Sequence, residues 1–235
     1  MDKTKYLEFS ENVLNITFKN IDLLITAFTH RSYLNEHKKT VKEHNERLEF
    51  LGDAVLELSV TEYLYTNFSE PEGVLTSWRS SLVRTESLAE SAYKLQFEDL
   101  LRLSKGEENG TKRARVQILA NTFEAIIGAI YLDQGYEIAD KFISAQIISK
   151  FDKIRELGIY LDYKSKLQEI AQKIESLTPS YKVIAEEGPD HDKNFKVGVF
   201  VGENLRGVGE GPSKQSAQQN AAETALKFYK NQESD

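Results

Sequence analysis

Four acidic side chains recur at three- and four-residue steps in one stretch of the chain: Glu46, Glu49, Asp53 and Glu57. On a helix, this spacing places them along one side. Like charges at such steps repel one another, which weakens an isolated helix slightly. Two arrangements relieve that repulsion: solvation of the acidic stripe, or a divalent cation bound by its carboxylate oxygens. The spacing alone leaves both open.

A second pair of oxygen-bearing side chains, Asn121 and Glu124, lies much further along the chain. Three residues apart, they share one face of a helix, opposite Phe123 and Ile127. Two helices that each offer such a pair can converge on a hard cation, and Mg²⁺ takes octahedral oxygen ligands. Acidic pairs are also common on helix surfaces, so either pair taken alone is weak evidence for a metal site.

The apolar pattern predicts the helices that would carry both pairs. The first runs from the acidic stretch to about Asn67, with an apolar stripe on its other side. That stripe consists of Leu48, Leu51, Val55 and Leu58. The second helix runs over residues 116–133, and Gly128 permits close packing there. Its predicted inward face consists of Leu119, Phe123, Ile126, Ile127 and Ile130.

The rest of residues 4–154 is also predicted to be helical, because none of it alternates as strands do. Two short helices are expected between residues 5 and 25, and a last helix over residues 137–154. Residues 35–44 and 104–110 are expected to be loops. The predicted fold class of this region is therefore all-α.

The pattern changes after residue 158. A helix is expected over residues 163–174, followed by three strands at about 181–185, 195–201 and 205–210. An alanine-rich helix over residues 212–229 follows the strands. The order helix, three strands, helix predicts a small α+β domain at 162–230, joined to the first domain by a linker at 155–161.

Composition limits the function classes. The 235 residues are 40% hydrophobic and 29% charged, which is typical of a globular protein. The longest apolar run, residues 125–132, is too short to cross a bilayer, and the first residues lack a signal-peptide core. The absence of cysteine excludes disulfides and thiolate zinc sites, and it fits a cytoplasmic protein. Because the net charge is −7, nucleic-acid binding would need local basic patches or bridging cations.

Residues 45–56, NERLEFLGDAVL, resemble the signature stretch of the ribonuclease III family nearly residue for residue. Three further landmarks agree in type and order: residues 29–33, 106–108 and 120–133. Residues 162–229 resemble a double-stranded-RNA-binding domain. The resemblance implies an endonuclease domain followed by an α-β-β-β-α RNA-binding domain, the simple bacterial arrangement.

By position, Glu49, Asp53 and Glu124 match the acidic active-site residues of the family. The resemblance implies that Glu49 and Glu124 ligate Mg²⁺, with Mn²⁺ as a substitute. It assigns catalytic roles to Asp53, as a ligand or water-orienting base, and to Glu124. The fourth family position is usually Asp, and here it is Asn121. An amide oxygen can still coordinate Mg²⁺, but the site loses one negative charge, so its metal affinity should fall.

The second domain must span two minor grooves of duplex RNA and the phosphates between them. Three elements are expected to do so: the first helix, the loop at 188–191 and the start of the last helix. Their candidate residues are Gln168, Glu169, Pro189, His191, Ser213 and Lys214. His191 could equally be a turn residue, and Ser213 a helix cap. Gln215 stands where the family often has a second basic residue, which predicts a missing phosphate contact.

The implied activity is cleavage of double-stranded RNA by a homodimer that joins through its nuclease domains. The expected products carry 5′-phosphate and 3′-hydroxyl ends with a short 3′ overhang, and the expected substrates are ribosomal RNA precursors and messengers. Phe50 is expected in the core or, by the resemblance, at the dimer interface. Glu46 is either a contact residue or solvated, and Glu57 is expected to be solvated. The alternative function is a dsRNA-binding regulator whose cleavage is impaired by Asn121.

Overall fold

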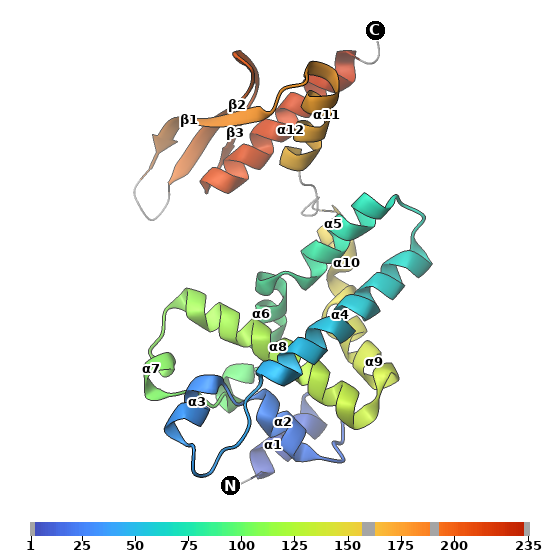
Figure 1. The fold of residues 1–235 in the computed structure, drawn as a ribbon, viewed down its shortest axis with the longest axis vertical. Helices are drawn as coiled ribbons and strands as arrows, with labels where there is room; N and C mark the ends of the chain where they lie inside the picture. The colour runs from blue at the N-terminus through green and yellow to red at the C-terminus, as the bar shows by residue number, and fades with distance from the viewer. Residues whose placement is uncertain (1–2, 157–162, 189–192, 233–235) are drawn as a thin grey trace. The chain divides into compact units, whose positions relative to one another are not determined.

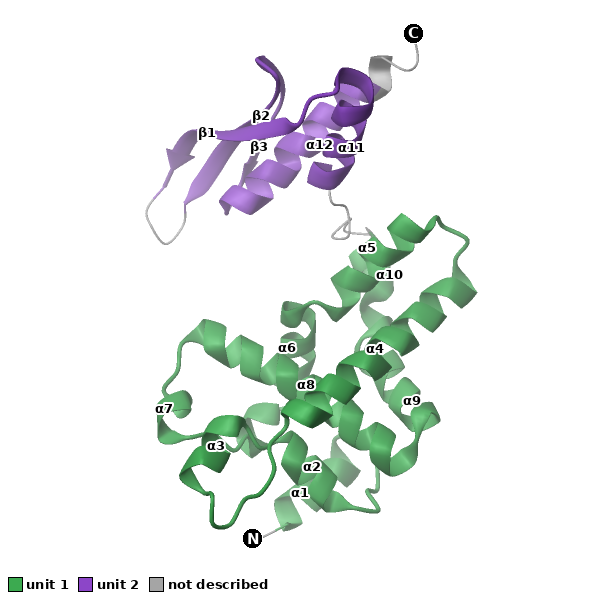
Figure 2. Cartoon of the chain, viewed as in Figure 1, with its two compact units in different colours: residues 1–160 green, residues 161–235 purple. Residues whose placement is uncertain are grey.

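The computed structural model describes residues 3–156, 163–188 and 193–232. It divides into two compact units, residues 1–160 and 161–235, coloured separately in Figure 2. The linker expected at 155–161 lies largely outside the described residues. Each unit has its own apolar core, and the two are described separately below.

Unit 1 is all-helical, as predicted (Figure 1). Its first eight elements are α1 (Thr4–Asn12), α2 (Ile21–Ala27), α3 (Arg31–Glu36), α4 (Glu46–Asn67), α5 (Glu72–Val83), α6 (Thr85–Lys94), η1 (Phe97–Leu100) and α7 (Lys105–Glu108). The last four are α8 (Lys112–Gln134), α9 (Tyr136–Gln146), η2 (Ile148–Lys150) and α10 (Phe151–Glu156). The sequence predicted the positions of both long helices, α4 and α8.

Two predicted segments differ from the structure. The expected loop at 104–110 contains the short helix α7, which begins there because the Ser104 hydroxyl accepts a hydrogen bond from the Glu107 amide. The single helix expected over 137–154 is broken into α9, η2 and α10. Periodicity misses such a break, because buried apolar residues such as Ile147 and Phe151 continue across it.

The core of unit 1 is built around the crossing of α4 and α8. All five predicted inward residues of α8 are buried. A glycine on each helix lets the backbones meet: a Cβ on Gly52 would stand 1.7 Å from the Glu124 carbonyl oxygen, and one on Gly128 would stand 2.2 Å from that of Leu48. Although α8 is long and apolar enough to cross a membrane by length and composition, 61% of that window is buried inside the protein, as in a core helix.

The exposed side of α4 carries three large apolar side chains. Phe50 is 81% exposed, and Leu58 and Tyr65 also lie open to solvent. The expectation that Leu58 belongs to the buried stripe is therefore wrong. Leu58 follows Phe50 and Ala54 at steps of four residues, so it lies on their side of α4. The buried Leu48 and Val55 lie on a different side.

Unit 2 has the predicted order of elements: α11 (Tyr163–Glu175), β1 (Pro179–Glu187), β2 (Asn194–Val201), β3 (Asn204–Gly211) and α12 (Lys214–Gln232). The strands form an antiparallel sheet in the order β1-β2-β3. The two helices lie against the sheet (Figure 1), and core residues of the sheet and both helices pack together. The close fit of α12 on β3 comes from small residues on both. They are Gly207, Gly209 and Gly211 on the strand and Ala217, Ala221 and Ala225 on the helix.

The alternation of Tyr181, Val183 and Ala185 along the sequence predicts that all three lie on one face of β1, but Val183 is exposed. The register shifts between Val183 and Ala185, as at a β-bulge, and both Val183 and Ile184 are largely exposed. A bulge adds one residue to the strand and so breaks the two-residue period on which the prediction rested.

Candidate active site and RNA interface

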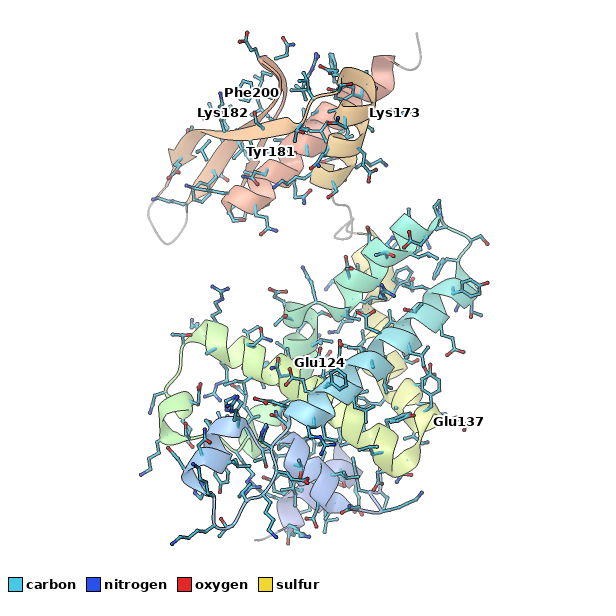
Figure 3. The ribbon with its side chains drawn as sticks, viewed as in Figure 1. Glu124, Glu137, Lys173, Tyr181, Lys182 and Phe200 are labelled. Carbon is cyan, nitrogen blue, oxygen red and sulfur yellow. The ribbon has the colours of Figure 1, made fainter. Side chains whose placement is uncertain are left out.

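The two predicted oxygen-bearing pairs converge where α4 crosses α8. Glu49 and Asp53 lie on α4 on either side of Gly52, whose Cα faces the Glu124 backbone directly. Glu124 lies on α8, beside the crossing in Figure 3. The charges of Asp53 and Glu49 both act on the Glu124 carboxyl group. The close helix crossing therefore brings together residues that are far apart in the sequence.

Glu124 is the most strongly perturbed carboxyl group of this cluster. Burial, followed by the charges of Asp53, Glu49 and Glu57, raises its pKa to about 8. Glu49 is shifted in the same direction: burial and then the Glu46 charge raise its pKa, while a hydrogen bond from Asn121 opposes that rise. Burial and crowding of the acidic groups thus disfavour the charged forms of Glu49 and Glu124.

This shift predicts how the stability of the metal-free protein depends on pH. The folded pKa of Glu124, about 8, lies above the ordinary value of 4.5, so its protonated form favours folding. That contribution is complete below about pH 4.5 and is lost as the pH rises through about 8. We expect the melting temperature, measured in a chelator, to fall over this range, and the fall to be smaller in Glu124→Gln. An equal fall in both proteins would contradict the assignment.

Asn121 lies on α8 beside the carboxylates of the cluster, close enough to Glu49 to lower the pKa of that carboxyl group. Its Oδ1 accepts a hydrogen bond from Gln117 Nε2 at 2.7 Å. The sequence argument selected Asn121 but missed Gln117, although Gln117 lies one helical turn earlier on the same face.

The oxygen-bearing side chains of the cluster are of the chemical type that a hard divalent cation prefers as ligands. Three carboxylates and one amide offer oxygen ligands, and a divalent charge would offset the repulsion that raises the pKa of Glu124. The set is not a preformed cage: among the described residues, no three His, Asp or Glu side chains already stand as a group that could hold a metal ion.

The neighbouring acidic residues make separate contacts. Glu57, expected to be solvated, is partly exposed and also forms an ion pair with Arg79 of α5, Oε2 to Nε at 2.8 Å. Glu46 Oε1 lies 3.6 Å from Arg31 Nη1, and the Glu46 side chain is about half exposed. His30 caps α3, its Nδ1 accepting from the Ser32 amide. Glu46 and Glu57 nevertheless act electrostatically on the cluster, Glu46 on Glu49 and Glu57 on Glu124.

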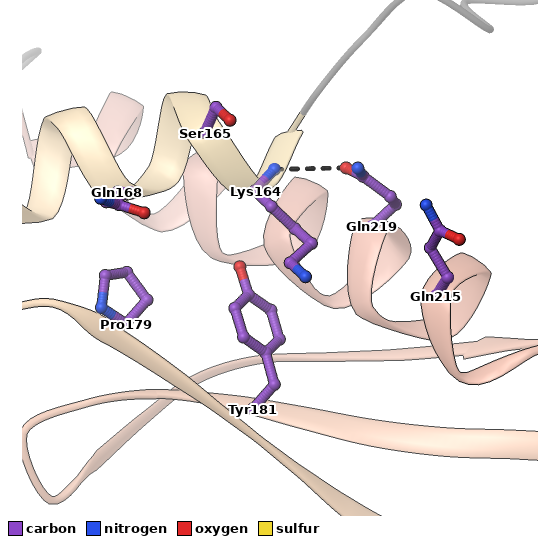
Figure 4. A pocket seen from close by; sticks show the side chains of 7 residues that line it. All are labelled: Lys164, Ser165, Gln168, Pro179, Tyr181, Gln215 and Gln219. Carbon is purple, nitrogen blue, oxygen red and sulfur yellow. Dashed lines mark hydrogen bonds between the residues drawn. The ribbon is translucent and has the colours of Figure 1, made fainter.

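In unit 2, Gln168 lies on α11 and lines a polar pocket of about 350 Å³ (Figure 4). Glu169, its neighbour, is exposed on the same helix. The other lining residues are Lys164, Ser165, Pro179, Tyr181, Gln215 and Gln219. The Gln219 side chain accepts from the Lys164 amide at 3.2 Å, which ties the first turn of α11 to α12. The sequence argument noted Gln215 only for its missing charge and did not select Gln219.

The start of α12 carries the other described candidates. The Ser213 hydroxyl accepts a hydrogen bond from the Ser216 amide at 3.1 Å, so Ser213 caps this helix. Capping was the alternative to an RNA contact that the sequence offered for Ser213. Lys214 Nζ lies 3.1 Å from Glu186 of β1 and over the Phe195 ring. An RNA phosphate would therefore compete with Glu186 for this ammonium group. Pro189 and His191 lie outside the described residues.

A helical domain with a carboxylate cluster at its central crossing, followed by an α-β-β-β-α domain, matches the order expected of a nuclease with a double-stranded-RNA-binding module. Comparison with known proteins gives the same result. Residues 20–151 match the family model "Ribonuclease-III-like", and residues 163–229 match "Double-stranded RNA binding motif". The chain belongs to the ribonuclease III family and is an endoribonuclease with a dsRNA-binding domain.

Similar proteins cover almost the whole chain. Ribonuclease 3 of Enterococcus faecalis is 46% identical over 228 residues, 97% of this chain and 98% of its own length. Ribonuclease 3 of Anoxybacillus flavithermus is 48% identical, over 94% of this chain and 93% of its own. A crystal structure of the nuclease domain of ribonuclease III from Campylobacter jejuni is 40% identical, with a TM-score of 0.54, and covers 62% of this chain and 95% of its own.

Proposed function

We propose that this endoribonuclease hydrolyses double-stranded RNA at the α4–α8 crossing with the help of Mg²⁺. The products would carry 5′-phosphate and 3′-hydroxyl ends with a short 3′ overhang. The observation that carries the proposal is the convergence of Glu49, Asp53 and Glu124, whose mutual repulsion calls for a cation. Processing of ribosomal and messenger RNA in the cytoplasm belongs to the same proposal.

In this reading, Glu49 and Glu124 would hold the cation, and Asn121 would offer its amide oxygen as a further ligand. When bound, the cation supplies an activated water and stabilises charge on the leaving oxygen. Asp53 is exposed and lies one residue from the crossing glycine, so it can accept a hydrogen bond from a water and orient it. The half-buried position of Glu124 limits solvent competition for its oxygens.

The proposed homodimer would form through Phe50 of α4. This side chain is 81% exposed and lines a surface cavity of about 820 Å³. Apolar members of the lining are Leu23, Leu48, Leu51 and Leu132. An exposed phenylalanine beside an apolar cavity on one surface suits a two-fold interface, in which each ring enters the other subunit's cavity. In a related structure, the nuclease domain of ribonuclease III from Campylobacter jejuni, a region involved in dimer formation shows structural flexibility.

Replacing Phe50 by alanine should weaken this dimer. Burying one phenylalanine side chain contributes about 1.5–3 kcal/mol, and a two-fold interface loses two of them. The dissociation constant should therefore rise by at least about a hundredfold, measured by analytical ultracentrifugation. Tyr93→Ala, which removes an exposed aromatic ring from α6, is the matched control and should leave the dimer intact. A Phe50→Ala protein as dimeric as the control would contradict this interface.

A direct test of the proposed reaction is the chemistry of the product ends. A perfectly paired RNA labelled on each strand is incubated with the protein and Mg²⁺, and the ends are mapped by phosphatase and ligase sensitivity. We expect the product ends to carry 5′-phosphates and 3′-hydroxyls. Each strand should be cut once, at positions offset so that each end has a short 3′ overhang. Products with 2′,3′-cyclic phosphates would refute the metal-assisted hydrolysis.

The second candidate function is a dsRNA-binding regulator with impaired cleavage. It is favoured by one observation, that the α8 residue beside Glu49 is the amide Asn121 rather than a further carboxylate. A gel shift of duplex RNA without cleavage, at any divalent-ion concentration, would support it over the nuclease.

A further inference from the structure

The pocket shown in Figure 4 lies between the parts of unit 2 that are expected to contact duplex RNA. Gln168 of α11 lines one side of it. Gln215, which directly follows Lys214 in the first turn of α12, lines another side, and Tyr181 of β1 lines a third. A duplex that contacts both Gln168 and Lys214 therefore runs past this pocket. Its volume of about 350 Å³ lies within the range typical of ligand sites.

The pocket offers neutral polar groups around one ammonium group. Gln168, Gln215 and Gln219 each carry an amide, which both donates and accepts hydrogen bonds. Lys164 carries the only charge among the lining residues that the structure describes. Side chains of this kind match the edge of a nucleobase, where donors and acceptors lie next to one another. They fit a row of phosphates less well, because phosphates are bound mainly by clustered lysine and arginine.

Gln215 shows the same balance at a single position. It stands where the ribonuclease III family often has a second basic residue, so one phosphate contact is expected to be missing there. The amide in its place lines the pocket, and glutamine is one of the side chains that pair with base edges. The exchange therefore removes a backbone contact and adds a group that can contact a base.

Contacts within unit 2 fix the walls of the pocket. Lys164 Nζ donates to Gln218 Oε1 at 2.7 Å and lies 4.9 Å from the centre of the Tyr181 ring. The Lys164 backbone amide donates to Gln219 Oε1, the bond drawn as a dashed line in Figure 4. These contacts join α11, α12 and β1 around the pocket. An aromatic ring beside hydrogen-bonding groups is a common support for unstacked RNA bases.

We propose that this pocket binds one unpaired nucleobase that projects from duplex RNA, so that unit 2 favours a duplex with a bulged nucleotide over a perfectly paired one. The inference deepens the proposed function and rests on its duplex-RNA substrate. The three glutamine amides bond the edge of the base, and Lys164 donates to one of its carbonyl oxygens. Because a bulged base has no pairing partner to leave, moving it into the pocket costs less than extruding a paired base.

The test compares two fluorescent RNA duplexes of about 16 base pairs, the span of one dsRNA-binding domain. They are identical except that one carries a single unpaired uridine at its centre. Anisotropy gives the dissociation constant of the full chain for each duplex, in a chelator that prevents cleavage. The value for the paired duplex is divided by that for the bulged duplex. We expect a ratio of about ten, within the range of about 5- to 150-fold that one stacked base contributes.

Gln215→Leu keeps a side chain of similar size but removes the amide, so its ratio should fall by about fivefold, the worth of one hydrogen bond. Gln172→Leu is the matched control: Gln172 is an exposed glutamine of α11 outside the pocket, and this variant should keep the wild-type ratio. A Gln215→Leu ratio equal to that of the wild type would mean that the shape of the bulged duplex, and not the pocket, causes the preference.

A wild-type ratio near one, with both duplexes bound, would overturn the pocket assignment and leave the proposed function standing. Failure to bind either duplex would overturn both. A second readout places 5-iodouridine in the bulge and maps its photo-crosslink by mass spectrometry. We expect the crosslink at Tyr181, and a crosslink confined to residues outside the pocket would contradict the proposal.

Discussion

Glu124→Ala is expected to abolish cleavage of duplex RNA, reducing the rate by at least about a thousandfold. The reason is that Glu124 is the half-buried member of the carboxylate cluster, and both Asp53 and Glu49 act on it electrostatically. Loss of a cation that stabilises transition-state charge costs several kcal/mol, and about 4 kcal/mol corresponds to a thousandfold in rate. The measurement is single-turnover cleavage of a labelled duplex with saturating protein.

The matched control is Glu137→Ala, which removes an acidic side chain from α9, away from Glu124 in Figure 3. It should cleave at close to the wild-type rate. Both variants should still shift duplex RNA on a gel, because unit 2 is unchanged. If Glu124→Ala cleaves as fast as Glu137→Ala, the catalytic site lies elsewhere.

Gly52→Ala is expected to destabilise unit 1 and to disable the site at once. The new Cβ would stand 1.7 Å from the Glu124 carbonyl oxygen, so α4 and α8 would have to move apart. Overpacking of a core costs about 1–3 kcal/mol, occasionally more, and this contact involves backbone that cannot turn aside. About 3 kcal/mol lowers the melting temperature of a domain of this size by about 6–12 °C.

Gly73→Ala is the control for the glycine itself. A Cβ at Gly73, on α5, would meet nothing within 4 Å, so this change should leave stability the same or raise it slightly. Thermal unfolding followed by circular dichroism compares the two. A Gly52→Ala protein that melts with the wild type and cleaves normally would mean that the α4–α8 crossing is not what positions Glu49 and Asp53 against Glu124.

Periodicity predicted α4 and α8 well because each helix has a continuous buried face. The alanines of α12 that face the small residues of β3 are also buried at a regular helical spacing. Periodicity failed where the burial of a side chain does not follow the periodic pattern of apolar residues. Leu58 is apolar but exposed, because it lies on the same side as Phe50. The break between α9 and α10 left no signal, because apolar residues continue through it. The short helix α7 was missed because a single Ser104 cap determines where it begins.

Spacing alone showed two separate pairs, and only the resemblance to the ribonuclease III family joined them into one site, because their convergence depends on tertiary structure. Nothing local to residues 45–56 shows that Gly52 faces Glu124, since that contact joins two helices. The partners of single polar residues were equally out of reach: Arg79 for Glu57, Gln117 for Asn121 and Glu186 for Lys214. Each of these contacts depends on side-chain positions that spacing does not determine.

The central claim is that the α4–α8 crossing cleaves duplex RNA with a divalent cation. Its most direct test is cleavage of a perfectly paired RNA over Mg²⁺ and Mn²⁺ titrations, by the wild type and by Asn121→Asp. We predict no cleavage in a chelator, cleavage that rises with either ion, and half-maximal activity at lower Mg²⁺ in Asn121→Asp, which restores a carboxylate. Cleavage that persists in the chelator, or none at any ion concentration from folded protein, would contradict the claim.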